Sequence, residues 1–308
     1  MHRLIVAERR WLSEAQFLNA LSFCMLLPGP EAMQLATYVG WRIHGILGGI
    51  VAGLLFVLPG ALIMLCLGIA YVYFGTFGIA GALFLGVKAA IVVIVLQALF
   101  RLAGKALQRP HQWVIAIIGF CGIFILALPF PLIIAMAAIC GFASNRHLQE
   151  TTKLPPLPNG KDTAKTFLIW VGIWWGPLLA VDLFANAPVL AEIGYFFSKL
   201  AVVTFGGAYA VLAYMAQDVI AQLGWLQPAE MMDGLGLAET TPGPLILVTE
   251  FVGFLAAFKT AGIAHGIAGA AIALWATFIP CFLWIFAGAP YLDWLACQPR
   301  LQSALASI

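Results

Sequence analysis

Apolar segments recur along the whole chain and are separated by short polar or Pro/Gly-rich stretches. A run of ~20 apolar residues is long enough to cross a bilayer as a helix. Backbone in contact with lipid must also satisfy its own hydrogen bonds, which a helix does within one segment. The pattern therefore predicts an all-α, polytopic integral membrane protein. The apolar segments fall at 15–40, 46–74, 77–100, 112–127, 131–143, 166–185, 194–216, 230–257 and 262–289.

Composition supports this interpretation and removes other classes of protein. Of the 308 residues, 63% are hydrophobic and 9% are charged, whereas soluble domains carry roughly 25% charged residues. The net charge of +2 gives no nucleic-acid footprint. The six cysteines are scattered through apolar runs without ligand-like spacing. Because no catalytic cluster is visible either, we expect no enzyme, no cofactor and no metal, and a lipid bilayer as the surroundings.

An internal repeat is the most informative feature of the sequence. Residues 11–30 align with residues 225–244 at an offset of 214, with seven identities in twenty positions. After an insertion of seven residues the offset becomes 221. Two blocks in one consistent order predict two copies of one membrane unit, a common plan of secondary transporters. The matched motifs are Trp11-Leu12 with Trp225-Leu226, Pro28-Gly29-Pro30 with Pro242-Gly243-Pro244, His44–Gly48 with His265–Gly269, and Pro59 with Pro280.

The repeat register divides the chain into three parts. We expect a first repeat at 1–143, a polar linker at 144–165 and a second repeat at 166–308. The second repeat has an apolar segment ahead of the residue equivalent to Met1, and it ends where the 77–100 segment is beginning. The first repeat is thus expected to lack its first helix, and the second its last helices. Basic residues precede the first Trp-Leu pair and acids surround the second, which favours an inverted repeat, while the number of crossings stays open.

The two Pro-Gly-Pro motifs are the strongest candidates for a functional site. Proline removes a backbone donor and clashes with the preceding turn, so each motif breaks a helix. The free N–H groups at the start of the following helix can hold an anion, and two such ends near the bilayer centre would form an oxyanion site. The alternative is a pair of packing kinks. The predicted substrate-binding residues, with the amide and hydroxyl side chains as donors, are Pro28, Gly29, Pro30, Gln34, Thr240, Thr241, Pro242, Gly243 and Pro244.

Two further groups of residues complete the predicted site. Thr204, Gly206 and Gly207 lie in a Thr-Phe-Gly-Gly motif, which offers either close approach of backbone to a substrate or a helix-packing contact. Acids in apolar surroundings often belong to ion or proton pathways, although they also cap helices or face water. A carboxylate beside an anion site repels the anion unless the carboxylate is protonated, so such acids are candidates for proton coupling. They are Glu31, Glu239 and Glu250.

Together these motifs resemble the chromate ion transporter family of the two-domain, long-chain type. The resemblance covers nearly the whole chain and falls in the expected order. It implies a two-domain carrier of the bacterial inner membrane that exports chromate and is driven by an ion or proton gradient. The residues that carry the resemblance are Leu26–Pro30, Gln34, Gly48-Gly49 and Phe56–Pro59 in the first half, and Thr204–Gly207, Trp225-Leu226 and Thr241–Pro244 in the second.

The predicted oxyanion site and this resemblance lead to one expected function. We predict a secondary transporter that moves chromate, a tetrahedral divalent oxyanion, out across the bacterial inner membrane and so confers chromate resistance. Sulfate is close to chromate in size and charge, so a carrier of sulfate or another oxyanion is the first alternative. An inactive membrane remnant or scaffold of a disrupted gene is the second. We expect no nucleic-acid partner, and the sequence leaves a homo-oligomer open.

Overall fold

The described residues of this computed structural model are 1–74, 160–185, 187–203 and 208–292, with isolated positions between 86 and 121. Within these ranges the regular structure is helical and contains no strand, in agreement with the all-α prediction. Three of the predicted apolar segments lie wholly or largely outside the described residues. They are 77–100, 112–127 and 131–143.

The chain divides into two compact units. One unit combines Met1–Lys88 with Leu157–Leu292, and the other combines Ala89–Pro156 with Asp293–Ile308. In the second unit only isolated helical positions are described. Every contact discussed below therefore lies within the first unit.

The helices of the first unit follow the predicted apolar segments, with two differences. The segment at 194–216 is divided into two helices, whereas the divisions of 15–40 and 230–257 fall at the Pro-Gly-Pro motifs, where the sequence predicts a break. In addition, α6 begins at Gly160, inside the stretch expected to be a linker. With η marking a short 3₁₀ or π-helical segment, the elements are η1 Arg3–Glu8, α1 Glu14–Leu26, α2 Glu31–Phe74, α6 Gly160–Phe184, α7 Pro188–Val203, α8 Ala208–Gln217, η2 Asp218–Gln222, α9 Pro228–Thr240, η3 Leu245–Leu247, α10 Val248–Ala261, α11 Ile263–Gly288 and η4 Ala289–Tyr291.

The two repeats begin with the same backbone structure. The Trp11 amide donates to the Ile5 carbonyl at 2.8 Å, and the Trp225 amide donates to the Val219 carbonyl at 3.0 Å. The helices that follow, α1 and α9, both start with the N-cap backbone N–H bonded to a side chain three residues later. These pairs obey the offset of 214, so the repeat seen in the sequence is also a repeat in the fold.

Each repeat then continues as a helical hairpin that reverses at a glycine. In α2 the backbone leaves the helix at His44 and Gly45, where Gly45 adopts φ 66° and ψ −158°. Between α10 and α11, Gly262 adopts φ 80° and ψ −163°. Such backbone angles are accessible almost only to glycine, because a Cβ atom would clash with the neighbouring peptide. Both turns therefore depend on residues without a side chain.

The two arms of each hairpin approach closely through glycines. A side chain on Gly40 would collide with the backbone of Gly48, and one on Gly253 with the backbone of Gly269. Because Gly48 and Gly269 are equivalent at the offset of 221, this contact pairs Gly40 with Gly253 at an offset of 213. Small residues of this kind let membrane helices pack at short distance. The hairpins thus correspond residue by residue near their crossing points.

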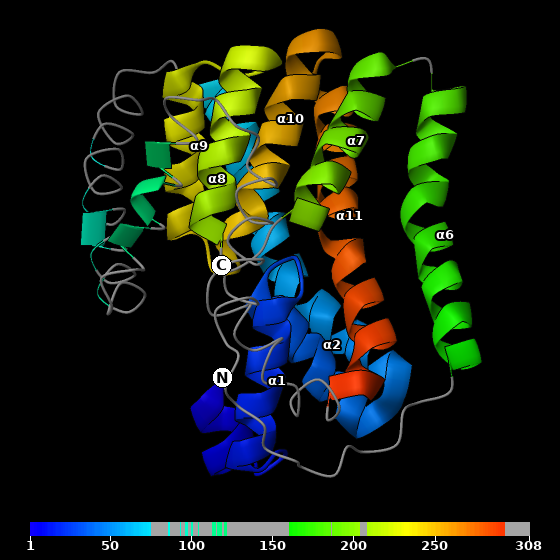
Figure 1. The fold of residues 1–308 in the computed structure, drawn as a ribbon. Coiled ribbons are helices and arrows are strands. Elements are labelled where there is room, and N and C mark those ends of the chain that lie inside the picture. The colour runs from blue at the N-terminus through cyan, green and yellow to red at the C-terminus, as the bar shows by residue number, and fades with distance from the viewer. Residues whose placement is uncertain are drawn as a thin grey trace. The chain divides into compact units, whose positions relative to one another are not determined.

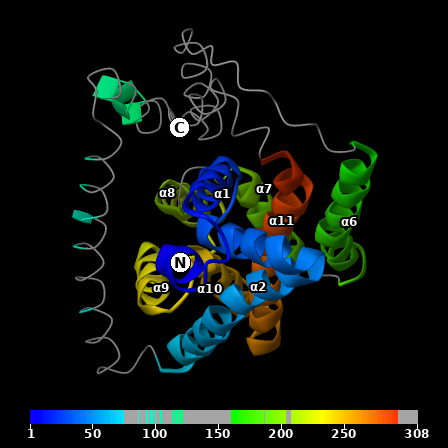
Figure 2. The same cartoon turned by 90° about the horizontal axis from the view of Figure 1, so that it is seen from below.

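The two repeats run in opposite directions through the unit. In Figure 1 the turn within α2 lies toward the lower end, whereas the turn between α10 and α11 lies at the upper end. In the view from below, α2 lies across α10 and α11, and α6 lies at the edge of the bundle (Figure 2). This arrangement is that of an inverted repeat, as the charges around the two Trp-Leu pairs predict.

The described helices of this unit are of two kinds, long and short. Among the described residues, α2, α6 and the α11–η4 segment are long and apolar enough to cross a membrane. The other helices, α1 and α7 to α10, have 10 to 16 residues. At ~1.5 Å per residue they reach about 15–24 Å, which is short of the ~30 Å hydrocarbon core. In Figure 1, α9 runs from the upper end toward the middle and α10 returns to the upper end, so the two form a short hairpin.

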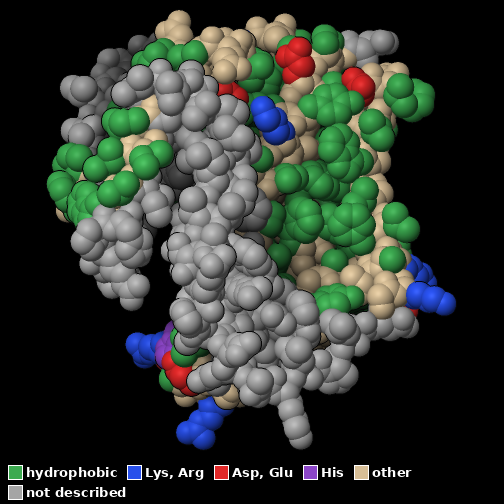
Figure 3. All heavy atoms as spheres, viewed as in Figure 1, with side chains coloured by type: hydrophobic (Ala, Val, Ile, Leu, Met, Phe, Trp, Pro, Cys, Tyr) green, Lys and Arg blue, Asp and Glu red, His purple; other side chains and the backbone are tan. Residues whose placement is uncertain are grey.

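The outer face of α6 has the polarity expected of a membrane-spanning surface. Apolar side chains such as Leu168 and Leu183 are strongly exposed there. Figure 3 shows a broad area of apolar side chains on the face that includes α6, with Lys and Arg near the end where α6 begins and acidic side chains, together with a basic one, toward the opposite end. A band of apolar side chains between two charged edges is typical of a surface that faces lipid.

The two repeats are joined where aromatic side chains of one repeat pack against glycines of the other. Phe286 and Phe282 of α11 lie where Cβ atoms on Gly49 and Gly53 of α2 would stand, at 2.6 Å in each case. Trp170 of α6 covers this contact, with ring centroids 5.5 Å from Phe282 and 5.1 Å from Phe286. The interface between the repeats is therefore fixed by shape, because no larger residue fits at the two glycines.

Candidate functional site

Both Pro-Gly-Pro motifs lie between helices. α1 and α9 end before the motif, and α2 and η3 begin after it. The middle glycines take φ 120° at Gly29 and φ 142° at Gly243, a region that other residues rarely adopt. The chain direction changes at each motif as a result, and the backbone groups at the new helix start are left without helical partners.

Each break lies against the other repeat. A Cβ atom on Gly29 would come within 2.9 Å of Cys281 Sγ on α11. A Cβ atom on Gly60 of α2 would collide with the Pro242 carbonyl oxygen and stand 3.5 Å from Gly243 Cα. Gly60 and Cys281 are equivalent at the offset of 221, so one contact occurs twice. Both breaks therefore lie at the interface of the repeats, where inverted-repeat transporters place their substrate sites.

The residue that covers the break differs between the repeats. At the first break Gln34 Nε2 donates to the Pro28 carbonyl at 2.7 Å and lies 2.9 Å from the Cβ position of Gly29. At the second break Leu247 Cδ1 takes the corresponding place, 2.8 Å from the Cβ position of Gly243. Gln34 and Leu247 are equivalent at the hairpin offset of 213. The first break thus has a polar cover and the second an apolar one.

Gln34 uses only part of its hydrogen-bonding capacity. Its exposed fraction is 0%, and Oε1 has no hydrogen-bond partner among the described residues. A buried amide offers two N–H donors and an oxygen acceptor, and an unused buried polar atom is costly. Such a group calls for a specific explanation, and a bound polar molecule is one.

A second pair of buried polar groups lies one turn further along each hairpin. Thr37 of α2 is fully buried, and Glu250 of α10 is 2% exposed. Within the described part of the chain, neither Thr37 Oγ1 nor Glu250 Oε2 has a hydrogen-bond partner. Thr37 lies three residues before Gly40 and Glu250 three before Gly253, so the two positions are equivalent. The repeats thus place a hydroxyl in one half where the other has an acid.

Threonine hydroxyls near the second break are occupied by backbone carbonyls. Thr241 Oγ1 donates to the Leu237 carbonyl at 2.6 Å, and Thr240 Oγ1 donates to the same carbonyl at 3.0 Å. Thr249 donates to the Ile246 carbonyl at 2.8 Å. These are side-chain bonds to carbonyls of the preceding turn, a local bond that threonine makes readily.

The structure brings together part of the predicted site. Pro28, Gly29 and Gln34 form one contact group at the first break, and Pro242 and Gly243 lie against the other repeat at the second. Of the other predicted residues, some are partly exposed beside the breaks, namely Pro30, Pro244, Glu31 and Glu239. Outside the described residues lie Thr204, Gly206 and Gly207.

Three residues at the breaks were not singled out from the sequence. Thr37, Leu247 and Cys281 become relevant only through the contacts between and within the repeats. The signal for Cys281 was present, because it follows Pro280 as Gly60 follows Pro59 in the repeat alignment. In the part of the chain that is described, no three His, Cys, Asp or Glu side chains are grouped so as to hold a metal ion.

Helices broken at equivalent motifs, in an inverted repeat with helices long enough to span a membrane, are features of multi-pass membrane transporters built from repeats. Comparison with known proteins is more specific. The family described as chromate transporter matches residues 1–142 and 191–308. The chain belongs to this family.

Relatives with assigned names agree with the family. The chain is 31% identical to a "Probable chromate transport protein" of Synechococcus elongatus, over 98% of this chain and 73% of the relative. It is 31% identical to a "Chromate transport protein" of Cupriavidus metallidurans, over 94% and 68% of the two chains. A "Chromate transport protein" of Pseudomonas aeruginosa is 30% identical, over 100% and 71%. No solved structure matches significantly.

Proposed function

We propose that the protein is a secondary transporter that moves chromate out across the bacterial inner membrane and so confers chromate resistance. Membership of the chromate transporter family and the names of three relatives support chromate as the cargo. The family is one of transporters, which argues against an enzyme. The observation that carries the proposed site is the buried Gln34 amide at the first break, with an acceptor oxygen left unused among the described residues.

The first break offers several donors to a tetrahedral oxyanion. The start of α2 presents free N–H groups and the positive end of its dipole. Gln34 adds an amide whose N–H now bonded to Pro28 can turn to a ligand. Thr37 adds a buried hydroxyl one turn along the same helix. An anion bound here would need several hydrogen-bond donors, because the surrounding apolar side chains do not compensate for its lost hydration.

The second break would complete the site from the other repeat. Pro242, Gly243 and Pro244 would present backbone there, and the hydroxyls of Thr240 and Thr241 would donate after leaving their carbonyls. The Thr-Phe-Gly-Gly motif between α7 and α8, with Thr204, Gly206 and Gly207, is proposed as a third place of close backbone approach. Of these residues, Thr241 is the most buried in the described structure.

The acids are proposed to couple anion movement to protons. Glu250 is the best placed, because it is buried and occupies the position equivalent to Thr37. Uptake of a proton by this carboxyl would remove the negative charge that repels an anion near the breaks. Glu31 and Glu239 stand closer to the two motifs but are partly exposed, so water can stabilise their charges.

Uptake of labelled chromate into proteoliposomes under an imposed proton gradient tests the proposal. Two variants are informative. Gln34→Leu places at the first break the leucine that the second break has, and Gln34→Glu adds a negative charge that repels the anion. Loss of a donor to a charged ligand costs about 1.5–3 kcal/mol, or roughly 10- to 150-fold in affinity. Gln222→Leu is the matched control, because Gln222 is exposed at the end of η2.

Two outcomes would contradict the proposal. Equal apparent affinity in the wild type and both Gln34 variants would remove the first break from the site. Absence of chromate movement in folded protein would refute the carrier itself. Unlabelled sulfate as a competitor decides between chromate and the wider class of oxyanions. Export is tested separately in cells, where expression should lower chromate accumulation.

A further inference from the structure

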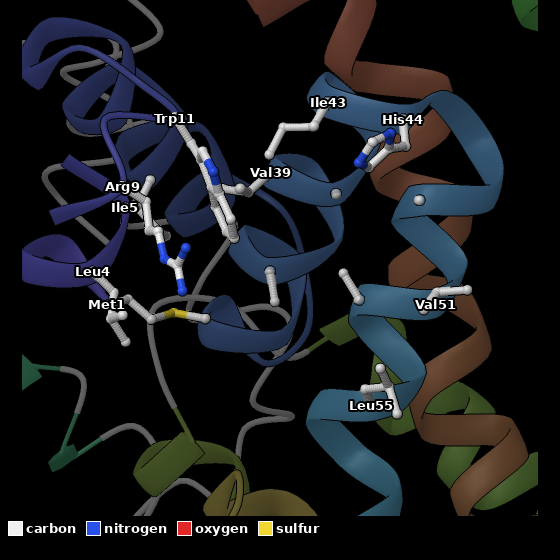
Figure 4. A pocket seen from close by; sticks show the side chains of 14 residues that line it. Met1, Leu4, Ile5, Arg9, Trp11, Val39, Ile43, His44, Val51 and Leu55 are labelled. Atoms are coloured by element: carbon white, nitrogen blue, oxygen red, sulfur yellow. The ribbon is translucent and has the colours of Figure 1, made fainter.

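A groove in the first repeat lies between η1 and the two arms of α2. Its volume is about 590 Å³. Figure 4 shows Trp11 and Arg9 on one side of the groove and Val51 and Leu55 on the other. We call it the α2 groove and define it by Leu4, Ile5, Trp11, Val39, Val51 and Leu55. The other lining residues are apolar as well, apart from Arg9 and His44.

In the second repeat, a helix fills the corresponding place. The Phe196 ring of α7 meets the Trp225 ring edge to face, with centroids 5.5 Å apart. A Cβ atom on Gly194 of α7 would lie 3.4 Å from Ile272 Cγ2 on α11. α7 therefore packs on the Trp-Leu segment and on the second arm of the hairpin at once. Both contacts are of the close-packed kind that joins membrane helices.

The repeat register maps these contacts onto the α2 groove. Trp225 corresponds to Trp11 at the offset of 214, and Ile272 corresponds to Val51 at the offset of 221. Trp225 is 9% exposed under α7, whereas Trp11 is 53% exposed and Val51 is 55% exposed. The same surface is thus covered in one repeat and uncovered in the other.

We propose that the α2 groove is a docking site for an apolar membrane helix with the packing face of α7. That face has a small residue toward Val51 and an aromatic ring toward Trp11. One difference is expected from the chain itself. Lys199 of α7 lies over the Tyr214 ring, with Nζ 5.7 Å from the centroid, and it also interacts with Asp218, whose equivalent residue in the first repeat is Leu4. The occupant of the α2 groove is therefore apolar where α7 carries lysine.

A labelled peptide in trans tests this proposal on the full chain in lipid nanodiscs. The peptide has the sequence of residues 188–203 with Lys199→Leu, a benzophenone in place of the Phe196 side chain and a fluorophore at one end. We expect saturable binding by fluorescence anisotropy and, after illumination, a cross-link to η1 or α2 next to Trp11. A peptide that also carries Gly194→Leu should bind at least about tenfold more weakly, because its side chain would meet Val51.

Matched protein variants decide where the peptide binds. Val51→Trp fills the groove and should weaken binding about tenfold or more. Leu62→Trp places the same side chain at an exposed position of the same helix outside the groove, and should leave binding unchanged. Both positions are exposed, so both variants should keep the wild-type melting temperature.

Three results would overturn the proposal. Binding that does not saturate would indicate that lipid acyl chains occupy the groove. Equal binding to wild type and Val51→Trp would place the peptide elsewhere. Cross-links to Trp225 would show that the peptide replaces α7 in the second repeat instead of entering the α2 groove.

Discussion

Replacing Gly60 with alanine tests whether the first repeat fixes the position of the Pro-Gly-Pro break in the second repeat. Gly60 lies in the second arm of α2, directly after Pro59. An added Cβ atom would collide with the Pro242 carbonyl oxygen and stand 2.7 Å from Leu247 Cδ1. The leucine methyl can rotate away, but the carbonyl belongs to the backbone of the second break. The break must therefore shift away from α2 if the variant folds.

The expected cost follows from comparison with a helical glycine that contacts nothing. Gly172 of α6 has no described atom within 4 Å of its Cβ position. In both variants, alanine gains up to about 1 kcal/mol of helix propensity over glycine. Only Gly60→Ala adds the overpacking term of about 1–3 kcal/mol. The difference between the two variants thus isolates the contact at the break.

The assay is unfolding of the purified full chain in detergent, followed by chromate uptake into proteoliposomes. Gly60→Ala should be less stable than Gly172→Ala by about 1–3 kcal/mol. It should also lose uptake at temperatures where it stays folded, because the second break has moved. If Gly60→Ala is as stable as Gly172→Ala and transports normally, the contact between Gly60 and Pro242 does not hold the break.

Three further variants test other parts of the reasoning. Glu250→Gln should keep chromate exchange but lose accumulation driven by a proton gradient, as measured with labelled chromate in proteoliposomes. Gly262→Ala should lower the free energy of unfolding by about 1–3 kcal/mol, since Gly262 has φ 80° and ψ −163°. Thermal unfolding in detergent measures this, and an unchanged stability would show that the turn can relax. Arg10→Gly should raise the free energy of unfolding by about 1–2 kcal/mol, since Arg10 has φ 52° and its equivalent, Gly224, has φ 62°. An unchanged melting temperature would show that the backbone at Arg10 is not strained.

The main features of the fold could be predicted from the sequence because they follow from local chemistry. Proline and glycine in the order Pro-Gly-Pro are incompatible with a continuous helix, whatever packs around them. Residues related by the offset of 214 also make equivalent hydrogen bonds in the structure, as the backbone amides of Trp11 and Trp225 do. The number of crossings could not be predicted in this way, because the apolar segments 194–216 and 230–257 are long enough to span but are each divided into shorter helices.

The details of the site could not be predicted, because they depend on small shifts in register. The 3₁₀ turn η3 follows the second motif, whereas α2 follows the first directly. The hairpin offset is consequently 213 instead of 214, and only the contact between Gly253 and Gly269 reveals it. At an offset of 214, Gln34 would align with Val248 and Thr37 with Phe251. The pairing of Thr37 with Glu250 therefore required the structure.

The residues paired at the offset of 213 differ in chemistry, and this difference bears on how two copies of one unit could carry out transport in one direction. Two identical breaks would bind an anion equally well and would offer no separate place for a proton. Here the breaks share their backbone but differ at the covering residue, Gln34 against Leu247, and one turn later, Thr37 against Glu250. At these two positions the first repeat thus has neutral groups, which under the proposed function would donate to an oxyanion, while the second has an acid at one of them, which would take up a proton. Because each break also packs on the other repeat, a shift of one hairpin would move both groups together, which the proposed proton coupling requires.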